Sequence, residues 1–74
     1  MPRRPCDEID RLIGERLRVR RLALGMTQAE LGALLSISFQ QVQKYERGFN
    51  RLAAADLPRL AAILRCKVTY FFRG

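Results

Sequence analysis

The outward-facing side chains of the segment 39–47 have the chemistry that proteins use to read DNA. They are Phe39, Gln40, Gln41, Gln43, Lys44 and Arg47. Glutamine can hydrogen-bond both N6 and N7 of adenine, lysine can donate to O6 or N7 of guanine, and phenylalanine can touch the methyl group of thymine. Arginine pairs with phosphate. No acidic residue precedes Glu46 in this segment, so the segment predicts a surface that contacts DNA.

The residues around this segment predict two short helices joined by a tight turn. Apolar residues recur at spacings of three, four and seven, and the pattern is interrupted once, around Ser36 and Ser38. These apolar residues are Leu31, Leu34, Leu35, Ile37, Val42 and Tyr45. One buried face is therefore expected to run across both helices, which is the arrangement of a helix-turn-helix.

Local signals predict where these two helices begin. Thr27 and Glu30 have the spacing of a capping box, in which the two residues satisfy each other's backbone N–H groups. This predicts a helix over 28–35. Ser38 is a second residue of the type that caps helices, and it predicts a helix over 39–47.

Further helices are expected on either side of this pair. Asp7 offers an N-cap for a first helix that ends at Gly25, and Asp10 places negative charge in its first turn. The apolar stripe of this helix is Ile9, Ile13, Leu17 and Leu24. Asp56 is expected to cap a fourth helix that has Pro58 in its first turn. The stripe of the fourth helix is Leu57, Leu60, Ala61 and Leu64.

The composition fits one small domain with a polyanionic partner. The chain has 74 residues, with 14 Lys and Arg against 7 Asp and Glu, a formal net charge of +7 and a sequence pI near 10.8. Residues 1–6 hold two prolines and two arginines and nothing to bury, so we expect a flexible basic arm there. The helix-turn-helix domain is then expected over 7–74.

Several classes of protein are not expected from this sequence. It contains no histidine, and Cys6 and Cys66 have no Cys-x-x-Cys spacing, so neither a metal site nor a cofactor is predicted. No glycine-rich phosphate loop or nucleophile arrangement is present, so we do not expect an enzyme. No apolar stretch approaches the roughly 20 residues of a membrane span, and the N-terminus lacks the apolar core of a signal peptide. A cytoplasmic protein without a membrane partner is expected.

From Ile13 to about Phe72 the chain resembles the phage-repressor-like helix-turn-helix family, also called the XRE or Cro/C1 type. The residues that carry the resemblance are Arg21, Gly25-Met26-Thr27-Gln28, Glu30-Leu31, Ile37-Ser38, Val42, Glu46-x-Gly48, Leu57, Leu60 and Ala61. The resemblance implies an all-α fold, a compact lambda-repressor-like bundle of five short helices around a central helix-turn-helix. It also implies that the third helix lies in the major groove of DNA and the second crosses the backbone.

The resemblance assigns roles to individual residues. Gln28, at the start of the second helix, is expected to meet a phosphate or a base edge, beside the N-terminal amides that follow Thr27. The implied base-reading positions are Ser38, Phe39, Gln40, Gln41 and Lys44. Implied phosphate contacts in the loop after the third helix include Asn50 and Arg51, and Arg47 completes the DNA-binding set.

A second implied feature is structural, an ion pair between Arg21 and Glu46, for which Arg20 is a rival partner. Two positions depart from the family pattern. Ser36 stands where a glycine is usual, at a cost on the order of 1 kcal/mol if the backbone there is left-handed. Gly32 replaces the usual alanine and should lower helix stability by up to ~1 kcal/mol.

The resemblance implies a sequence-specific transcriptional regulator, a repressor that binds an inverted repeat as a homodimer. Three adjacent aromatic residues, Tyr70, Phe71 and Phe72, cannot all point inward from one turn, so we expect them to provide the dimer contact. Other interpretations stay open. Gln40 and Gln41 are also compatible with a solvated helix surface that contacts no DNA. Phe39 is also compatible with a purely structural role, in which its ring packs against the turn. The chain is also compatible with an antitoxin or other protein-interaction module with autoregulatory DNA binding, and with the N-terminal domain of a longer regulator.

Overall fold

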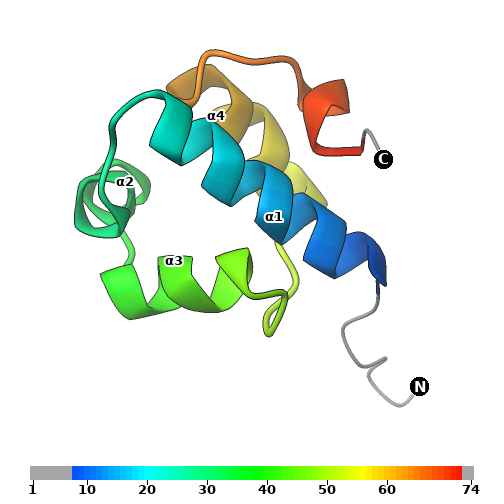
Figure 1. Cartoon of the computed structure of the whole chain (residues 1–74), viewed down its shortest axis with the longest axis horizontal. Helices are drawn as coiled ribbons and strands as arrows, with labels where there is room; N and C mark the ends of the chain where they lie inside the picture. The colour runs from blue at the N-terminus through cyan, green and yellow to red at the C-terminus, as the bar shows by residue number, and fades with distance from the viewer. Residues whose placement is uncertain (1–7, 73–74) are drawn as a thin grey trace.

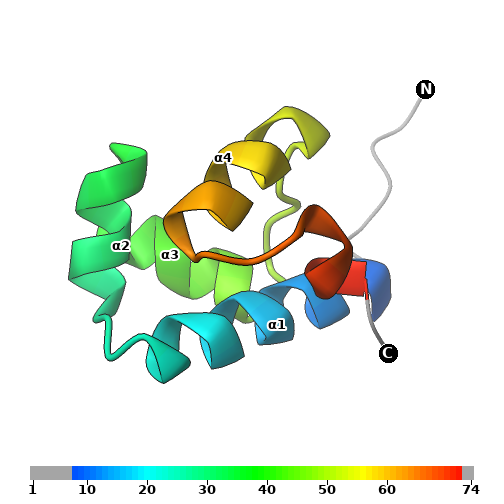
Figure 2. The same ribbon diagram turned by 90° about the horizontal axis from the view of Figure 1, so that it is seen from above.

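The computed structural model describes residues 8–72, which form four α-helices and two short 3-10 helices. In chain order these are α1 (Glu8–Ala23), α2 (Gln28–Leu35), α3 (Phe39–Glu46), η1 (Ala54–Asp56), α4 (Leu57–Ile63) and η2 (Val68–Phe72). Figures 1 and 2 show α1 crossing the molecule, with α2 and α3 at one end and η2 beside the other end. No helix in this part of the chain is long and apolar enough to cross a membrane.

The predicted caps of α2 and α3 are confirmed. The Thr27 hydroxyl accepts a hydrogen bond from the Glu30 backbone N–H at 3.0 Å, and a Glu30 carboxylate oxygen accepts one from the Thr27 N–H at 3.0 Å. The Ser38 hydroxyl accepts from the Gln41 N–H at 3.2 Å. Because these contacts are local in sequence, the capping residues alone predict where both helices of the helix-turn-helix begin.

All four α-helices end in the same way, with a left-handed residue just beyond the last turn. These residues are Gly25, Ser36, Gly48 and Arg65, with φ of 67°, 59°, 73° and 56°. In each case the next residue's N–H donates back to a carbonyl in the last turn, as from Ile37 to Gly32 at 2.9 Å. Ser36 therefore adopts the left-handed conformation for which the family usually has a glycine, and this conformation is strained for serine.

The C-terminal half differs from the sequence prediction in two places. Asp56 was expected to cap α4, but its side chain makes no capping hydrogen bond, because the residue is already helical (φ −86°, ψ −15°) at the end of η1. The fifth helix is present as the five-residue 3-10 segment η2. The described structure is thus a helical domain of four α-helices rather than five. Asp7 and the arm 1–6 lie outside the described residues.

The core lies where all four α-helices and η2 meet, and it is largely the predicted one. Its least accessible side chains are Leu17, Leu31, Val42, Leu60, Leu64 and Phe71. Two predictions of burial were wrong, since Ile9 is 57% exposed and Leu34 is 50% exposed. Ile9 lies in the first turn of α1, at the edge of the core, and the inward side of the two-turn helix α2 is already filled by Leu31, Gly32 and Leu35.

Two glycines allow the backbones to approach closely. A Cβ atom on Gly14 would lie 2.2 Å from the Tyr45 carbonyl oxygen, so α1 and α3 pack backbone against backbone there. A Cβ on Gly32 would lie 2.7 Å from the Ile37 carbonyl oxygen. The usual alanine would need a backbone shift at Gly32, which offsets the helix-propensity cost predicted for this glycine.

The left-handed conformation of Ser36 can be tested for its cost in stability. We expect Ser36→Gly to raise the free energy of unfolding by about 0.5 to 1 kcal/mol, because glycine adopts this conformation without a clash at Cβ. Urea unfolding followed by circular dichroism measures the change. Ser36→Ala, which keeps Cβ, serves as the control and should give no stabilisation. Equal changes in the free energy of unfolding for the two variants would contradict the claim that the backbone is strained at this position.

Candidate nucleic-acid interface

The outer side of α3 carries the residues that the sequence predicts to face DNA. Val42 and Glu46 are buried against the domain, whereas Gln40, Lys44 and Arg47 are exposed. Phe39 is 49% exposed, and Gln41 is half-buried. The helix thus presents amide, ammonium and guanidinium groups outward while its apolar side holds it to α1. The first residue of α3, Phe39, adds a partly exposed phenyl ring to this side.

The start of α2 lies beside α3, and its polar groups are partly committed within the domain. The Thr27 hydroxyl is engaged in the capping box described above. The Gln28 side-chain amide donates to Glu46 Oε1 at 3.1 Å. Gln28 is half-buried, so its amide is held between α2 and α3 rather than extended into solvent.

A buried ion pair connects α1 to the end of α3. Arg21 Nε donates to Glu46 Oε2 at 2.6 Å, and Arg21 Nη2 donates to Glu46 Oε1 at 3.0 Å. The remaining terminal nitrogen, Nη1, donates to the Met26 carbonyl at 2.7 Å. The side chains are 8% and 2% exposed, so the pair is shielded from solvent and from dissolved salt. Bidentate geometry and full hydrogen bonding are what such a pair needs to offset its desolvation.

Arg20, the rival partner, has a different role. Its Nε donates to the Leu64 carbonyl and its Nη2 to the Arg65 carbonyl, both at 2.8 Å. These carbonyls lie just after the last turn of α4, where helices leave acceptors unsatisfied. Arg20 therefore attaches the end of α4 to α1 and leaves Glu46 to Arg21.

The loop after α3 brings together a pair that sequence reasoning missed. Arg51 Nη2 lies 3.1 Å from Asp10 Oδ2, and Arg51 Nε donates to the same carboxylate. The Asp10 side chain is 5% exposed and that of Arg51 is 42% exposed. The two residues are 41 positions apart, so no local pattern could have paired them. Asn50, the other predicted loop contact, is half-buried beside Arg51.

Two titratable groups have shifted pKa values. The Thr27 backbone N–H and hydroxyl lower the pKa of Glu30, because both stabilise the charged carboxylate. The stabilisation is therefore present above the ordinary pKa of glutamate and is lost as the pH falls through the lowered pKa. Burial raises the pKa of the Cys66 thiol, with a smaller opposing effect of Arg20. Cys66 is thus held as the neutral thiol in a partly apolar site.

The three C-terminal aromatic residues lie in different environments. Phe71 is fully buried in the core, whereas Phe72 is 50% exposed. Tyr70 packs edge-on against Phe71, with ring centroids 5.8 Å apart, and the Arg16 guanidinium carbon lies 5.3 Å from the centroid of the Tyr70 ring. Of the three, Phe72 is therefore the ring with most of its surface open to a partner.

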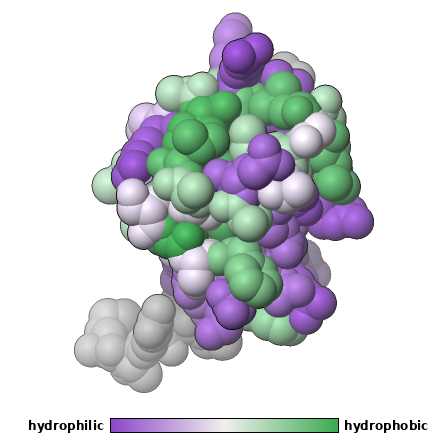
Figure 3. All heavy atoms as spheres, turned by 90° about the vertical axis from the view of Figure 1, so that its left-hand side faces the viewer, coloured by the Kyte–Doolittle hydropathy of each residue, from purple (hydrophilic) through white to green (hydrophobic). Residues whose placement is uncertain are grey.

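The surface around α2 is a mixture of polar and apolar groups. Figure 3 shows the side of the molecule on which α2 lies, with hydrophobic and hydrophilic side chains interleaved. Leu34 and Phe39 are among the exposed large apolar residues of α2 and α3. Within residues 8–72, no group of three or more His, Cys, Asp or Glu is arranged to hold a metal ion.

Comparison with known proteins connects this geometry to a family. The family model HTH_3, described as helix-turn-helix, matches residues 17–71. An uncharacterised HTH-type transcriptional regulator from Sinorhizobium medicae (strain WSM419) is 50% identical over 64 residues, which cover 86% of this chain and 46% of that protein. The chain thus spans about half the length of the curated relatives that it matches.

Solved structures show the same fold. The P22 c2 repressor in complex with a synthetic operator is 32% identical, with a TM-score of 0.72 over 80% of this chain and 89% of that one. The restriction-modification controller protein C.AhdI from Aeromonas hydrophila is 29% identical, with a TM-score of 0.76 over 84% of this chain and 94% of that one. The four α-helices described above thus have the lambda-repressor-like arrangement.

The buried ion pair predicts a specific pattern of stabilities. Glu46→Leu should lower the free energy of unfolding by about 3 to 5 kcal/mol, because it leaves the Arg21 charge buried without a partner. The double variant Arg21→Met, Glu46→Leu should recover much of that loss, since no unpaired charge remains. Urea unfolding of both variants and of the parent chain measures the difference. A double variant no more stable than the single one would show that the unpaired charge is not the cause.

Proposed function

We propose that this chain, which belongs to the helix-turn-helix family HTH_3, is a transcriptional regulator that binds double-stranded DNA. The observation that carries the proposal is the position of α3, whose outer side presents Gln40 and Lys44 while the buried Arg21–Glu46 pair holds its far end. The net charge of +7 favours a polyanionic partner. The similar P22 c2 repressor was solved with operator DNA, which supports the same kind of ligand here.

In the proposed complex, α3 lies in the major groove and α2 crosses the backbone. Base edges are contacted from α3 and its cap, by Ser38, Phe39, Gln40, Gln41 and Lys44. Phosphates are contacted by Thr27, Arg47, Asn50 and Arg51, and by Gln28 through the amide N–H that Glu46 does not accept. Arg51 has a second role in this scheme, because its guanidinium also binds the buried Asp10, so the same side chain supports the loop that it presents to DNA.

We further propose that the regulator acts as a homodimer on an inverted repeat and represses by occlusion in the cytoplasm. The dimer contact is assigned to the C-terminal segment Tyr70–Phe72, with Phe72 as its exposed ring and Phe71 as its buried support. A two-fold dimer places equivalent helices on one side of the duplex, so the half-sites should be about 10 base pairs apart.

Selection of bound duplexes from a random pool tests this function. At about 0.15 M salt, where long-range attraction is screened, a sequence-specific dimer should enrich an inverted repeat. Sequencing of the enriched pool then gives the operator. Binding that leaves the pool random and disappears as salt is added would contradict sequence-specific regulation and indicate attraction by charge alone.

The role of Gln40 predicts a loss that depends on sequence. Gln40→Ala should weaken binding to the selected operator by about 1 to 3 kcal/mol and leave binding to random duplex unchanged. Fluorescence anisotropy with both duplexes measures the two affinities. Val19→Ala, a truncation at an exposed position of α1, is the control. Equal losses on operator and random duplex would remove Gln40 from the base-reading set.

The dimer assignment predicts that one aromatic ring matters more than its neighbours. Phe72→Ser should raise the dimer dissociation constant by about tenfold or more, because a two-fold dimer loses two rings and full burial of one is worth roughly 1.5 to 3 kcal/mol. Sedimentation equilibrium measures the constant. Thr69→Ser, on the same segment, should leave it unchanged. An unaltered dimer in Phe72→Ser would place the dimer contact elsewhere.

A further inference from the structure

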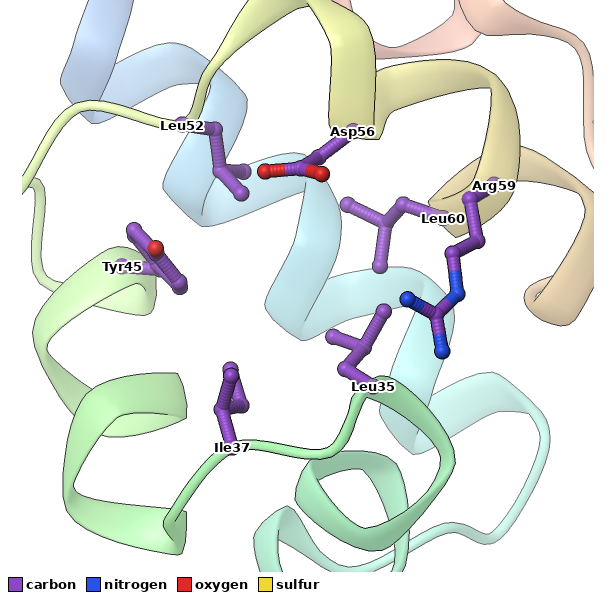
Figure 4. A pocket seen from close by; sticks show the side chains of 7 residues that line it. All are labelled: Leu35, Ile37, Tyr45, Leu52, Asp56, Arg59 and Leu60. Carbon is purple, nitrogen blue, oxygen red and sulfur yellow. The ribbon is translucent and has the colours of Figure 1, made fainter.

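A hollow lies between the turn of the helix-turn-helix and α4, away from the outer side of α3. Its apolar lining consists of Leu35, Ile37, Tyr45, Leu52 and Leu60, which come from α2, the turn, α3, the following loop and α4 (Figure 4). Its volume is about 110 Å³. At roughly 30 Å³ for each water-sized group, this is space for three to four carbon atoms with their hydrogens.

Asp56 places a solvent-exposed carboxylate at the rim of this hollow. The residue occupies the N-cap position of α4, where an aspartate normally accepts a backbone N–H, yet its side chain makes no capping bond. Among residues 8–72 it has no hydrogen-bond or ion-pair partner for its carboxylate. Figure 4 shows the carboxylate directed over the hollow, next to Leu52.

Arg59 places a cation at the same rim, one helical turn further along α4. Its Nη2 donates to the Leu34 carbonyl at 3.1 Å, which anchors the guanidinium at the end of α2 beside Leu35. A guanidinium has five N–H donors, so this bond leaves most of them for another acceptor. Asp56 and Arg59 do not form an ion pair with each other in the described structure.

We propose that this hollow binds a free α-amino acid with a compact aliphatic side chain. The ligand's ammonium group binds the Asp56 carboxylate, its carboxylate binds the Arg59 guanidinium, and its side chain enters the apolar lining. The small volume selects a branched chain of the size of valine or leucine. A charged or amide side chain is disfavoured, because the lining offers it little to replace its hydrogen bonds with water.

Binding at this site is separate from the DNA contacts assigned above. The hollow is nevertheless built partly from the helix-turn-helix itself, through Leu35, Ile37 and Tyr45. If the proposed function holds, the ligand adds contacts between this unit and α4, and any effect on DNA affinity must be matched by an equal effect of DNA on ligand affinity. The binding test below uses no DNA, so its failure and the failure of the proposed function are distinguishable.

Titration of the whole ¹⁵N-labelled chain with L-leucine, followed by NMR, tests the proposal. We expect saturable shifts at the amides of Ile37, Tyr45, Leu52 and Asp56, with a dissociation constant of roughly 0.1 to 10 mM for a ligand of this size. Three probes each lack one part of leucine: glycine lacks the apolar chain, 4-methylpentanoate lacks the ammonium and 3-methylbutylamine lacks the carboxylate. Each should bind at least about tenfold more weakly.

Variants of the two rim residues, Asp56 and Arg59, provide a second test by the same titration. Asp56→Asn and Arg59→Gln should each weaken L-leucine binding by about tenfold. The matched controls Glu15→Gln and Arg18→Gln change the same charges at exposed positions of α1 and should leave it unchanged. Absence of saturable shifts in the parent chain would overturn the proposal. Equal binding of leucine and 4-methylpentanoate, or equal loss in the rim and control variants, would also overturn it, since either result indicates only attraction to the basic protein.

Discussion

The buried contact between Arg21 and Glu46 is the interaction on which the arrangement of this domain depends. One carboxylate at the end of α3 accepts hydrogen bonds from α1 through Arg21 and from the first residue of α2 through Gln28. The same guanidinium also binds the Met26 carbonyl in the connection between α1 and α2. The three helices are thus joined at one point, so the spacing between the start of α2 and the outer side of α3 follows from it.

Arginine side chains also bind buried carboxylates or backbone carbonyls elsewhere in the domain. Asp10 and Glu46 are the two buried acids of the described structure, and each is paired with an arginine. Arg20 binds the carbonyls at the end of α4. These side chains neutralise charge or satisfy acceptors inside the domain, and the surface keeps the excess of basic residues that attracts a polyanion.

The sequence predicts best what depends on neighbouring residues. The capping residues Thr27 and Ser38 place both helices of the helix-turn-helix correctly, because their hydrogen bonds span only three positions. Contacts across the fold escape such patterns. Periodicity could not tell that Leu34 would be left outside, that Phe71 rather than Phe72 would fill the core, or that Asp56 would not cap α4. For the candidate site, the resemblance placed its residues on α3, but the commitment of Gln28 and Arg51 to internal acids is visible only in three dimensions.

The absence of a side chain at Gly14 has a consequence for how this domain can change. Since α1 and α3 touch through backbone atoms at this position, their separation does not depend on the size of any side chain there. The outward residues of α3 make no part of that contact. A new set of residues can therefore be placed on the outer side of α3 without moving the helix, so under the proposed function the DNA sequence that is bound can change while the fold stays the same.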